Sequence, residues 1–122
     1  MNTKQHLMEE AIVETTKLEE FCRQCELEIL VGNKDDDITF KSVLVNRPGL
    51  LLAGFEDYFG KSRVQVIGYA EFYYLATLQG DVKEKALTRL CNQKIPCIIY
   101  ARGIKPTQME IDIAKQYDIP IL

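Results

Sequence analysis

The chain of 122 residues contains no long hydrophobic run. Its longest apolar stretches, Gly49–Phe55 and Ile98–Ala101, hold only a handful of residues, whereas a membrane-spanning helix needs about 20. The first dozen residues include two glutamates and no apolar block of the length that a signal peptide needs. We therefore expect a protein that has no membrane partner and resides in the cytoplasm.

Histidine occurs once, as His6. Nucleophilic triads depend on histidine as a base, and many metal sites depend on it as a ligand. His6 has no candidate partner near it in the sequence. The sequence therefore gives little support to either class of site.

An excess of basic residues is also absent, because the chain carries 15 basic and 18 acidic residues and a formal net charge of −3. Proteins that bind nucleic acid usually gather lysine and arginine on one face, so we expect no nucleic-acid partner. The charge is uneven: residues 1–37 hold 4 basic and 10 acidic side chains, and the remainder is mildly basic. We expect the acidic part to be a solvated surface, or to dock on the basic remainder or on a partner.

The four cysteines do not form a convincing metal site. Cys22 and Cys25 make a C-x-x-C pair, but structural zinc sites usually have a second short pair. Cys91 and Cys97 are more widely spaced, and Cys97 lies in an apolar run whose alternation points it into a core. We interpret the cysteines as small hydrophobic residues in a reducing compartment.

A Gly-Lys-Ser sequence at residues 60–62 resembles the end of a phosphate-binding loop. In such a loop the first glycine stands five positions before the second, but that position here is Phe55, and Gly54 is one residue too early. The loop must also open a helix, whereas Arg63–Ile67 reads as a strand. We therefore interpret Gly60–Ser62 as a turn between elements.

Hydrophobic periodicity predicts alternating strands and helices. The predicted helices are 15–26, 69–78, 81–90 and a segment that begins near Pro106, and the predicted strands are 27–31, 38–45, 63–67 and 95–100. Thr15 or Thr16 with Glu19, and Asp81 with Glu84, have the spacing of N-terminal helix caps. The chain ends in a strand-like stub, 119–122.

Two predicted helices have recognisable inner faces. For the first, we expect Phe72, Leu75, Ala76 and Tyr69 to face the core; for the last, Met109, Ile113, Ala114 and Tyr117. Strand–helix–strand alternation favours parallel pairing with helical crossovers. We therefore predict a single α/β domain over residues 15–122, with a small, largely parallel or mixed sheet flanked by helices. Residues 1–14 are predicted to form an acidic arm that can fray.

Several sequence blocks form a recognisable set: Asn46–Leu50, Ala53–Phe55, Tyr58–Phe59, Arg63–Gly68 with Glu71, Ile95–Ile99, Arg102–Gly103 and Tyr117–Leu122. Together they resemble the N-terminal domain of the bifunctional HPr kinase/phosphorylase family. The likeness covers about residues 15–122, and its most specific block is Arg-Pro-Gly-Leu-x-x-Ala-Gly at residues 47–54. Gly60–Ser62, the C-x-x-C pair and the acidic arm are not part of the family pattern.

The resemblance implies a non-catalytic N-terminal domain with a regulatory, assembly or partner-binding role. A full-length member would use ATP or pyrophosphate with magnesium, in a separate kinase domain, to phosphorylate a serine of HPr and to remove that phosphate. This reaction controls sugar uptake and carbon catabolite repression in bacteria. The implied fold is similar to the N-terminal domain of the peptidoglycan-precursor ligase MurF. The implied partners are the protein's own kinase domain, other subunits of a homo-oligomer, and HPr.

No catalytic, cofactor-binding or metal-binding residue is expected within this chain. The residues expected to form an interaction or structural motif are Arg47, Pro48, Gly49, Gly54, Arg63 and Arg102. We expect Arg47 to anchor a local hydrogen-bond network, since half-buried arginines usually do. The alternative hypothesis is a stand-alone module that senses a small ligand, with Arg47, Lys61, Arg63 and Arg102 receiving an anion. The truncated appearance of residues 119–122 favours a fragment of a longer protein.

Overall fold

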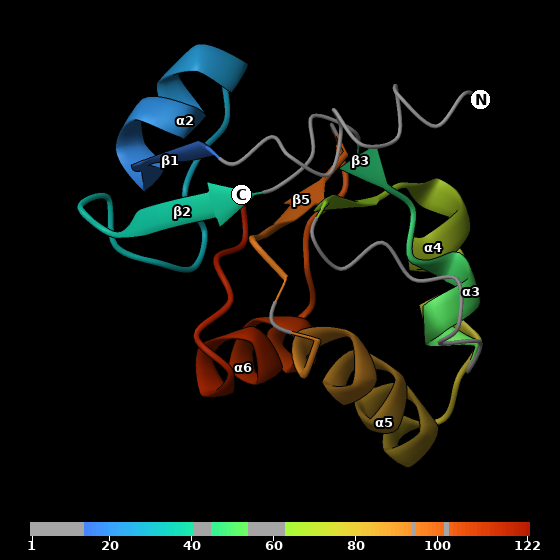
Figure 1. The fold of residues 1–122 in the computed structure, drawn as a ribbon. Coiled ribbons are helices and arrows are strands. Elements are labelled where there is room, and N and C mark those ends of the chain that lie inside the picture. The colour runs from blue at the N-terminus through green and yellow to red at the C-terminus, as the bar shows by residue number, and fades with distance from the viewer. Residues whose placement is uncertain (1–13, 41–44, 54–62, 94, 102) are drawn as a thin grey trace, which may run out of the picture.

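The computed structural model describes residues 14–40, 45–53, 63–93, 95–101 and 103–122 (Figure 1). Its centre is a parallel sheet of three strands in the order β3-β4-β5. β3 is Val45–Asn46, β4 is Val64–Ile67 and β5 is Ile98–Tyr100. Val45 pairs with Val64, and Gln65 pairs with Ile98. The parallel sheet confirms the α/β class.

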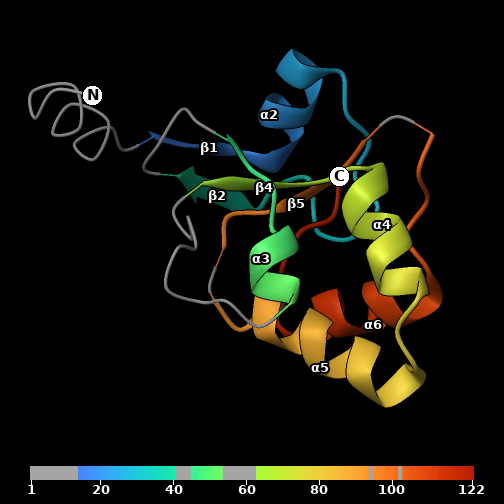
Figure 2. The ribbon, with the colours of Figure 1, turned by 90° about the vertical axis from the view of Figure 1, so that its right-hand side faces the viewer.

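Four helices cover one face of this sheet, as Figure 2 shows. They are α3 (Gly49–Leu52), α4 (Tyr69–Ala76), α5 (Gly80–Cys91) and α6 (Gln108–Gln116). On the other side lies α2 (Leu18–Cys25), beside an antiparallel pair formed by β1 (Glu14–Lys17) and β2 (Asp37–Phe40). Among the described residues, no helix combines the length and the apolar character that crossing a bilayer requires.

Side-chain alternation along the strands divides the core between these two sides. Ile67, Ile98 and Tyr100 belong to the large cluster under the four helices. Val64 and Cys97 belong to the smaller cluster around Leu18 of α2. Both faces of the sheet are therefore covered, which is why its strands read as nearly continuous apolar runs.

The first predicted helix begins too early. Residues 14–17 form β1, and the helix begins at Leu18 without a side-chain cap. The hydroxyl of Thr15 lies 2.8 Å from that of Thr39 on β2, so it is used between strands. Thr15 and Thr16 are β-branched and favour a strand once a partner strand is available.

The predicted strand 27–31 is also wrong, apart from one bridge. Val31 pairs with Ile121 of the terminal stub, and Ile121 in turn pairs with Ile98 of β5. Pro120 has no N–H to donate, which limits how far this ladder can extend. The predicted strand 38–45 is divided as well, because β2 pairs with β1 whereas Val45 belongs to β3 in the other sheet.

The remaining element predictions are confirmed in position. They correspond to β4, β5, α4, α5 and α6. The predicted cap of α5 is wrong, since its N-cap is Gln79 with no side-chain hydrogen bond. On α4, Leu75 is buried as predicted, but Ala76 and Tyr69 are exposed. On α6, Ile113 and Ala114 are buried, and Met109 and Tyr117 pack against the same core.

Candidate functional site

The carboxyl ends of the three parallel strands meet at one edge of the sheet. β3 ends at Asn46 and is followed by Arg47, and β4 ends at Ile67 and is followed by Gly68. β5 ends at Tyr100, and Gly103 follows it closely. Ligands of open α/β sheets usually bind at this edge, so we take it as the candidate site.

An ion pair joins two of the elements at this edge. Arg47 donates through Nε to Glu71 Oε1 and through Nη2 to Glu71 Oε2, the second bond being 2.9 Å long. Glu71 lies in the first turn of α4 and is only 4% exposed, whereas the Arg47 side chain is 55% exposed. The paired geometry matches the guanidinium fork to the carboxylate. It ties the end of β3 to the start of α4.

Gly68 makes room for this pair. A Cβ atom at residue 68 would lie 2.2 Å from Arg47 Nη2 and 2.8 Å from its Cζ. The Gly68 amide also points at Glu71 Oε1, at 3.5 Å. Residue 68 must therefore lack a side chain for the guanidinium to lie across the backbone.

The charge state of Glu71 follows from these contacts. Burial alone would raise its pKa, but the hydrogen bond from Arg47, the backbone amides and the Arg47 charge outweigh burial and lower the pKa below 4.5. The hydrogen bond and charge of Glu71 raise the pKa of Arg47. Both groups are therefore ionised at neutral pH, and each neutralises the other.

Two tyrosines are exposed on α4, the helix that begins directly after Gly68. Tyr69 and Tyr73 are 55% and 62% exposed. Their rings are nearly parallel, with centroids 6.0 Å apart. The Tyr69 hydroxyl approaches Gly103, where a Cβ atom would lie 3.1 Å from it. Gly103 has a φ of 87°, which only glycine adopts easily.

The sequence-predicted motif residues do not all gather at this edge. Pro48 is fully buried, and a Cβ at Gly49 would lie 4.0 Å from Glu71 Cγ. Arg63 immediately precedes β4, at the opposite end of that strand from Gly68. Gly54, Lys61 and Arg102 lie outside the described residues. The structure therefore brings Arg47, Pro48 and Gly49 to the site and leaves Arg63 at the other edge.

A second buried carboxylate was missed by the sequence analysis. Glu110 is 3% exposed and accepts hydrogen bonds from the Thr107 amide and hydroxyl, each 2.6 Å long. The Tyr100 hydroxyl donates to its other oxygen at 2.9 Å. The Thr107-x-x-Glu110 spacing is that of a capping box and could have been found. Because this carboxylate is fully occupied in joining β5 to α6, its role is structural.

The cysteines occupy different environments. Cys22, Cys91 and Cys97 are buried, and Cys25 is exposed at the end of α2. Burial raises the pKa of Cys91 and of Cys97 to about 12. Within the described ranges, no three potential ligands among His, Cys, Asp and Glu are grouped to hold a metal ion.

We expect Cys25 to be the one cysteine that a thiol reagent modifies quickly in the folded chain. The thiolate is the reactive form, and the three buried thiols are both shielded and held protonated. A rapid-mixing assay with a chromogenic disulfide should show a fast phase of one thiol per chain. Cys25→Ser should abolish that phase, and survival of a fast phase in the variant would contradict the assignment.

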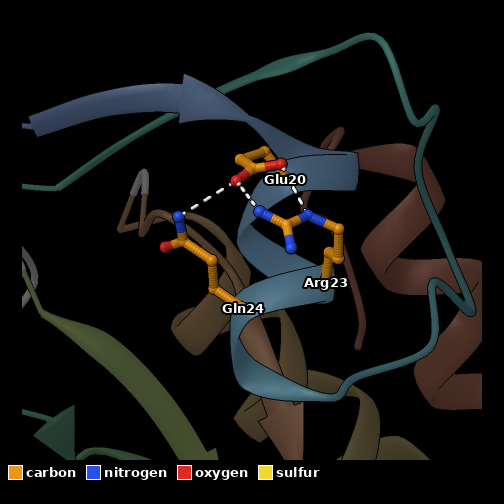
Figure 3. Close-up of polar contacts among 3 residues, drawn as sticks. All are labelled: Glu20, Arg23 and Gln24. Carbon is orange, nitrogen blue, oxygen red and sulfur yellow. Dashed lines mark hydrogen bonds and ion pairs between the residues drawn. The ribbon is translucent and has the colours of Figure 1, made fainter.

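The acidic residues of α2 form a local surface network. Glu20 accepts hydrogen bonds from Arg23 and, at 3.0 Å, from Gln24 (Figure 3). The hydrogen bond from Arg23 lowers the pKa of Glu20. Lys17 similarly pairs with Asp37 at 2.9 Å. These contacts support the interpretation of this part as a solvated surface.

Comparison with known proteins assigns the family. Residues 16–122 match the family described as the HPr Serine kinase N terminus. The chain is 42% identical over 101 residues to an HPr kinase/phosphorylase of Clostridium acetobutylicum, which covers 83% of this chain and 33% of that protein. It is 38% identical over 82 residues to the Caldicellulosiruptor bescii protein of the same name, covering 67% of this chain and 26% of the other.

The comparison also shows how much of each relative the chain covers. A Thermoanaerobacter HPr kinase/phosphorylase is 36% identical over 101 residues, again 33% of its length. The chain therefore spans about a third of the curated relatives that it matches. The match begins two residues into β1 and includes every other element described above. The chain belongs to the family of the HPr serine kinase N-terminal domain.

Proposed function

We propose that the chain acts as the non-catalytic N-terminal domain of an HPr kinase/phosphorylase, with a regulatory, assembly or partner-binding role. The observation that carries this proposal is the family match over residues 16–122, combined with relatives of which the matched part is only about a third. In the whole protein, phosphate transfer to and from a serine of HPr would take place in a kinase domain outside this chain. ATP or pyrophosphate and magnesium would bind there, in the cytoplasm, in a protein that controls carbon use.

The geometry of the described residues supports a non-catalytic role. Glu71 and Glu110, the two buried carboxylates, are each held by hydrogen bonds that join secondary-structure elements. Residues 60–62 lie outside the described part of the chain, but the first element described after them is β4 and not a helix. A phosphate-binding loop needs that helix. The proposal includes a fold similar to that of the N-terminal domain of MurF.

The alternative of a stand-alone anion sensor has less support. Arg47 already uses Nε and Nη2 on Glu71, which neutralises its charge. Arg63 lies at the other end of β4. Since Arg47 follows a strand whose Asn46 pairs with Gln65, its backbone is roughly 10 Å from that of Arg63 along the strand direction. The side chains of Arg47 and Arg63 are therefore attached at opposite edges of the sheet.

The test compares the chain with the whole protein. The gene beyond codon 122 should encode a Gly-x-x-x-x-Gly-Lys-Ser/Thr loop. Purified HPr incubated with ATP and magnesium should gain phosphoserine with the full-length protein and none with the 122-residue chain. Deleting this domain from the full-length protein should leave phosphate transfer detectable while changing its oligomeric state or its response to effectors. Phosphorylation of HPr by the isolated chain would overturn the proposal.

A further inference from the structure

A groove lies beside β2. Its volume is about 560 Å³. Apolar side chains of Ile38 and Ile95 line it together with Pro96 and Pro120, and Asp36, Asp37 and Asp118 are its carboxylates. Ile38 and Ile95 are buried, while all three aspartates are exposed. The groove therefore has apolar lining and acidic groups open to solvent.

One edge of β2 has no strand beside it in the described part of the chain. β1 and β2 form a sheet of two strands, so β2 is paired along one edge only. The pairing pattern shows which groups face outward. Leu18 N donates to Asp36 O at 2.8 Å, and the register places Lys17 opposite Asp37.

Hydrogen-bonded and non-hydrogen-bonded pairs alternate along an antiparallel ladder. Residues 18 and 36 form a hydrogen-bonded pair, so the pair 16–38 is hydrogen-bonded as well. The pairs between them and beyond, 17–37 and 15–39, are non-hydrogen-bonded. The backbone N–H and C=O groups of Asp37 and Thr39 consequently point away from β1. Both residues line the groove. Four main-chain groups thus face it with the spacing that an extended strand requires.

We propose that this groove binds an extended, basic segment of a separate polypeptide, which adds as a strand to the free edge of β2. Main-chain bonds to Asp37 and Thr39 supply the pairing, as in other cases of strand addition. The apolar side chains of the segment lie on the face of β2 that carries Ile38, and its lysine or arginine side chains lie on the face that carries Asp37, within the field of Asp36 and Asp118 at the rim of the groove. This inference is independent of the proposed function, because it is argued from the edge of β2 and the groove beside it alone.

The acidic residues around the groove favour a bound segment that is positively charged. Asp37 is paired with Lys17, whose charge also acts on Asp36, but neither Asp36 nor Asp118 forms an ion pair among the residues that the structure describes. A second copy of this chain is a poor occupant, because a symmetric β2–β2 contact would bring the same aspartates together. Like charges facing each other across strands are destabilising. The acidic rim thus discourages self-pairing and favours a basic strand.

The probe is a labelled hexapeptide of alternating lysine and valine, with both ends blocked. Binding to the 122-residue chain should shift the amide resonances of Asp37 and Thr39 and slow their hydrogen exchange. Affinity should fall as salt is added. The same peptide with glutamate in place of lysine, or with alternate backbone nitrogens methylated, should bind far more weakly. No saturable binding below about 1 mM, or equal binding of either control peptide, would overturn the proposal.

Variants of the chain separate the two contributions. Asp36→Asn combined with Asp118→Asn should weaken peptide binding about tenfold. Asp81→Asn combined with Glu84→Gln makes the same charge change on α5 and should leave binding unchanged. Equal loss in both double variants would show that only net charge matters and would contradict a docking groove.

Thr39 tests the backbone pairing. Thr39→Pro removes an outward N–H without breaking the ladder to β1, and it should weaken binding about fivefold. Thr39→Val keeps that N–H and loses only the hydroxyl contact with Thr15, so it should bind like the parent. In sedimentation experiments, the parent chain should not form a dimer through the edge of β2. If it forms a dimer, Thr39→Pro should leave that dimer intact. A dimer of that kind would assign the edge to a second copy instead.

Discussion

Replacing Arg47 with alanine is expected to lower the free energy of unfolding by about 2 kcal/mol, or the melting temperature by about 8 °C. The substitution removes the cation from Glu71, a carboxylate that is only 4% exposed in the folded chain and that Arg47 helps to keep ionised. Breaking a fully buried pair in this way costs roughly 3–5 kcal/mol. Because the guanidinium is half exposed and water screens it, the smaller figure applies. Thermal unfolding followed by circular dichroism measures the change.

The matched control is Arg23→Ala on α2. Arg23 and Glu20 form a pair with the same two-bond geometry, but both side chains are exposed. Water replaces the lost contacts there, so the melting temperature should change by less than about 2 °C. Gly68→Ala should behave like Arg47→Ala, since its Cβ would displace the guanidinium. Equal effects of Arg47→Ala and Arg23→Ala would show that burial of Glu71 is unimportant.

The same pair gives an acid dependence with a definite sign. The folded-state pKa of Glu71 is lowered below 4.5, so its contribution to stability is complete above the unfolded-state pKa. It is lost as the pH falls through the folded-state pKa. The stability difference between the parent and Glu71→Gln should therefore shrink as the pH is taken from about 7 to about 3. A difference that stays constant over that range would exclude an ionised Glu71.

The sequence predicted those features that local periodicity controls. β4, β5, α4, α5 and α6 repeat at helical or strand spacing over enough residues to be recognised. The expectation that Arg47 anchors a local network is supported by its bonds to Glu71. Its partner, however, is 24 residues away and could not be identified from spacing. Only the crossover that places α4 after β4 brings Glu71 beside the end of β3.

The wrong predictions come from local patterns that the fold does not use, and in the first of them a distant partner strand overrode the pattern. Thr15 and Thr16 fit a helix cap, yet β2 offers Thr15 a cross-strand hydroxyl contact and a ladder of backbone bonds. Asp81 and Glu84 fit a capping box, but the helix begins earlier, after Gln79. Tyr69 was expected inside because it falls at helical spacing with Phe72 and Ala76, but it is exposed and its ring stacks on that of Tyr73 instead. Capping signals are short and therefore recur by chance.

Replacing Glu110 with alanine is expected to have the largest effect, about 3 kcal/mol of unfolding free energy or about 12 °C in melting temperature. The change removes the acceptor for the Tyr100 hydroxyl and for the Thr107 amide and hydroxyl. Tyr100 is buried, and burial together with the Glu110 charge raises its pKa, so the hydroxyl stays protonated and must donate. A buried donor left without an acceptor loses its full solvation energy.

Three variants distinguish this loss from a general weakening of α6. Glu110→Gln keeps the volume and one acceptor and should retain about half of the stability that alanine loses. Asp112→Ala, on the same helix but exposed, removes a contact with Gln108 and should shift the melting temperature by less than about 2 °C. Tyr100→Phe should lessen the penalty of Glu110→Ala when the two are combined, because the orphaned hydroxyl is then absent. Strictly additive effects would mean that the Tyr100–Glu110 bond does not hold β5 against α6.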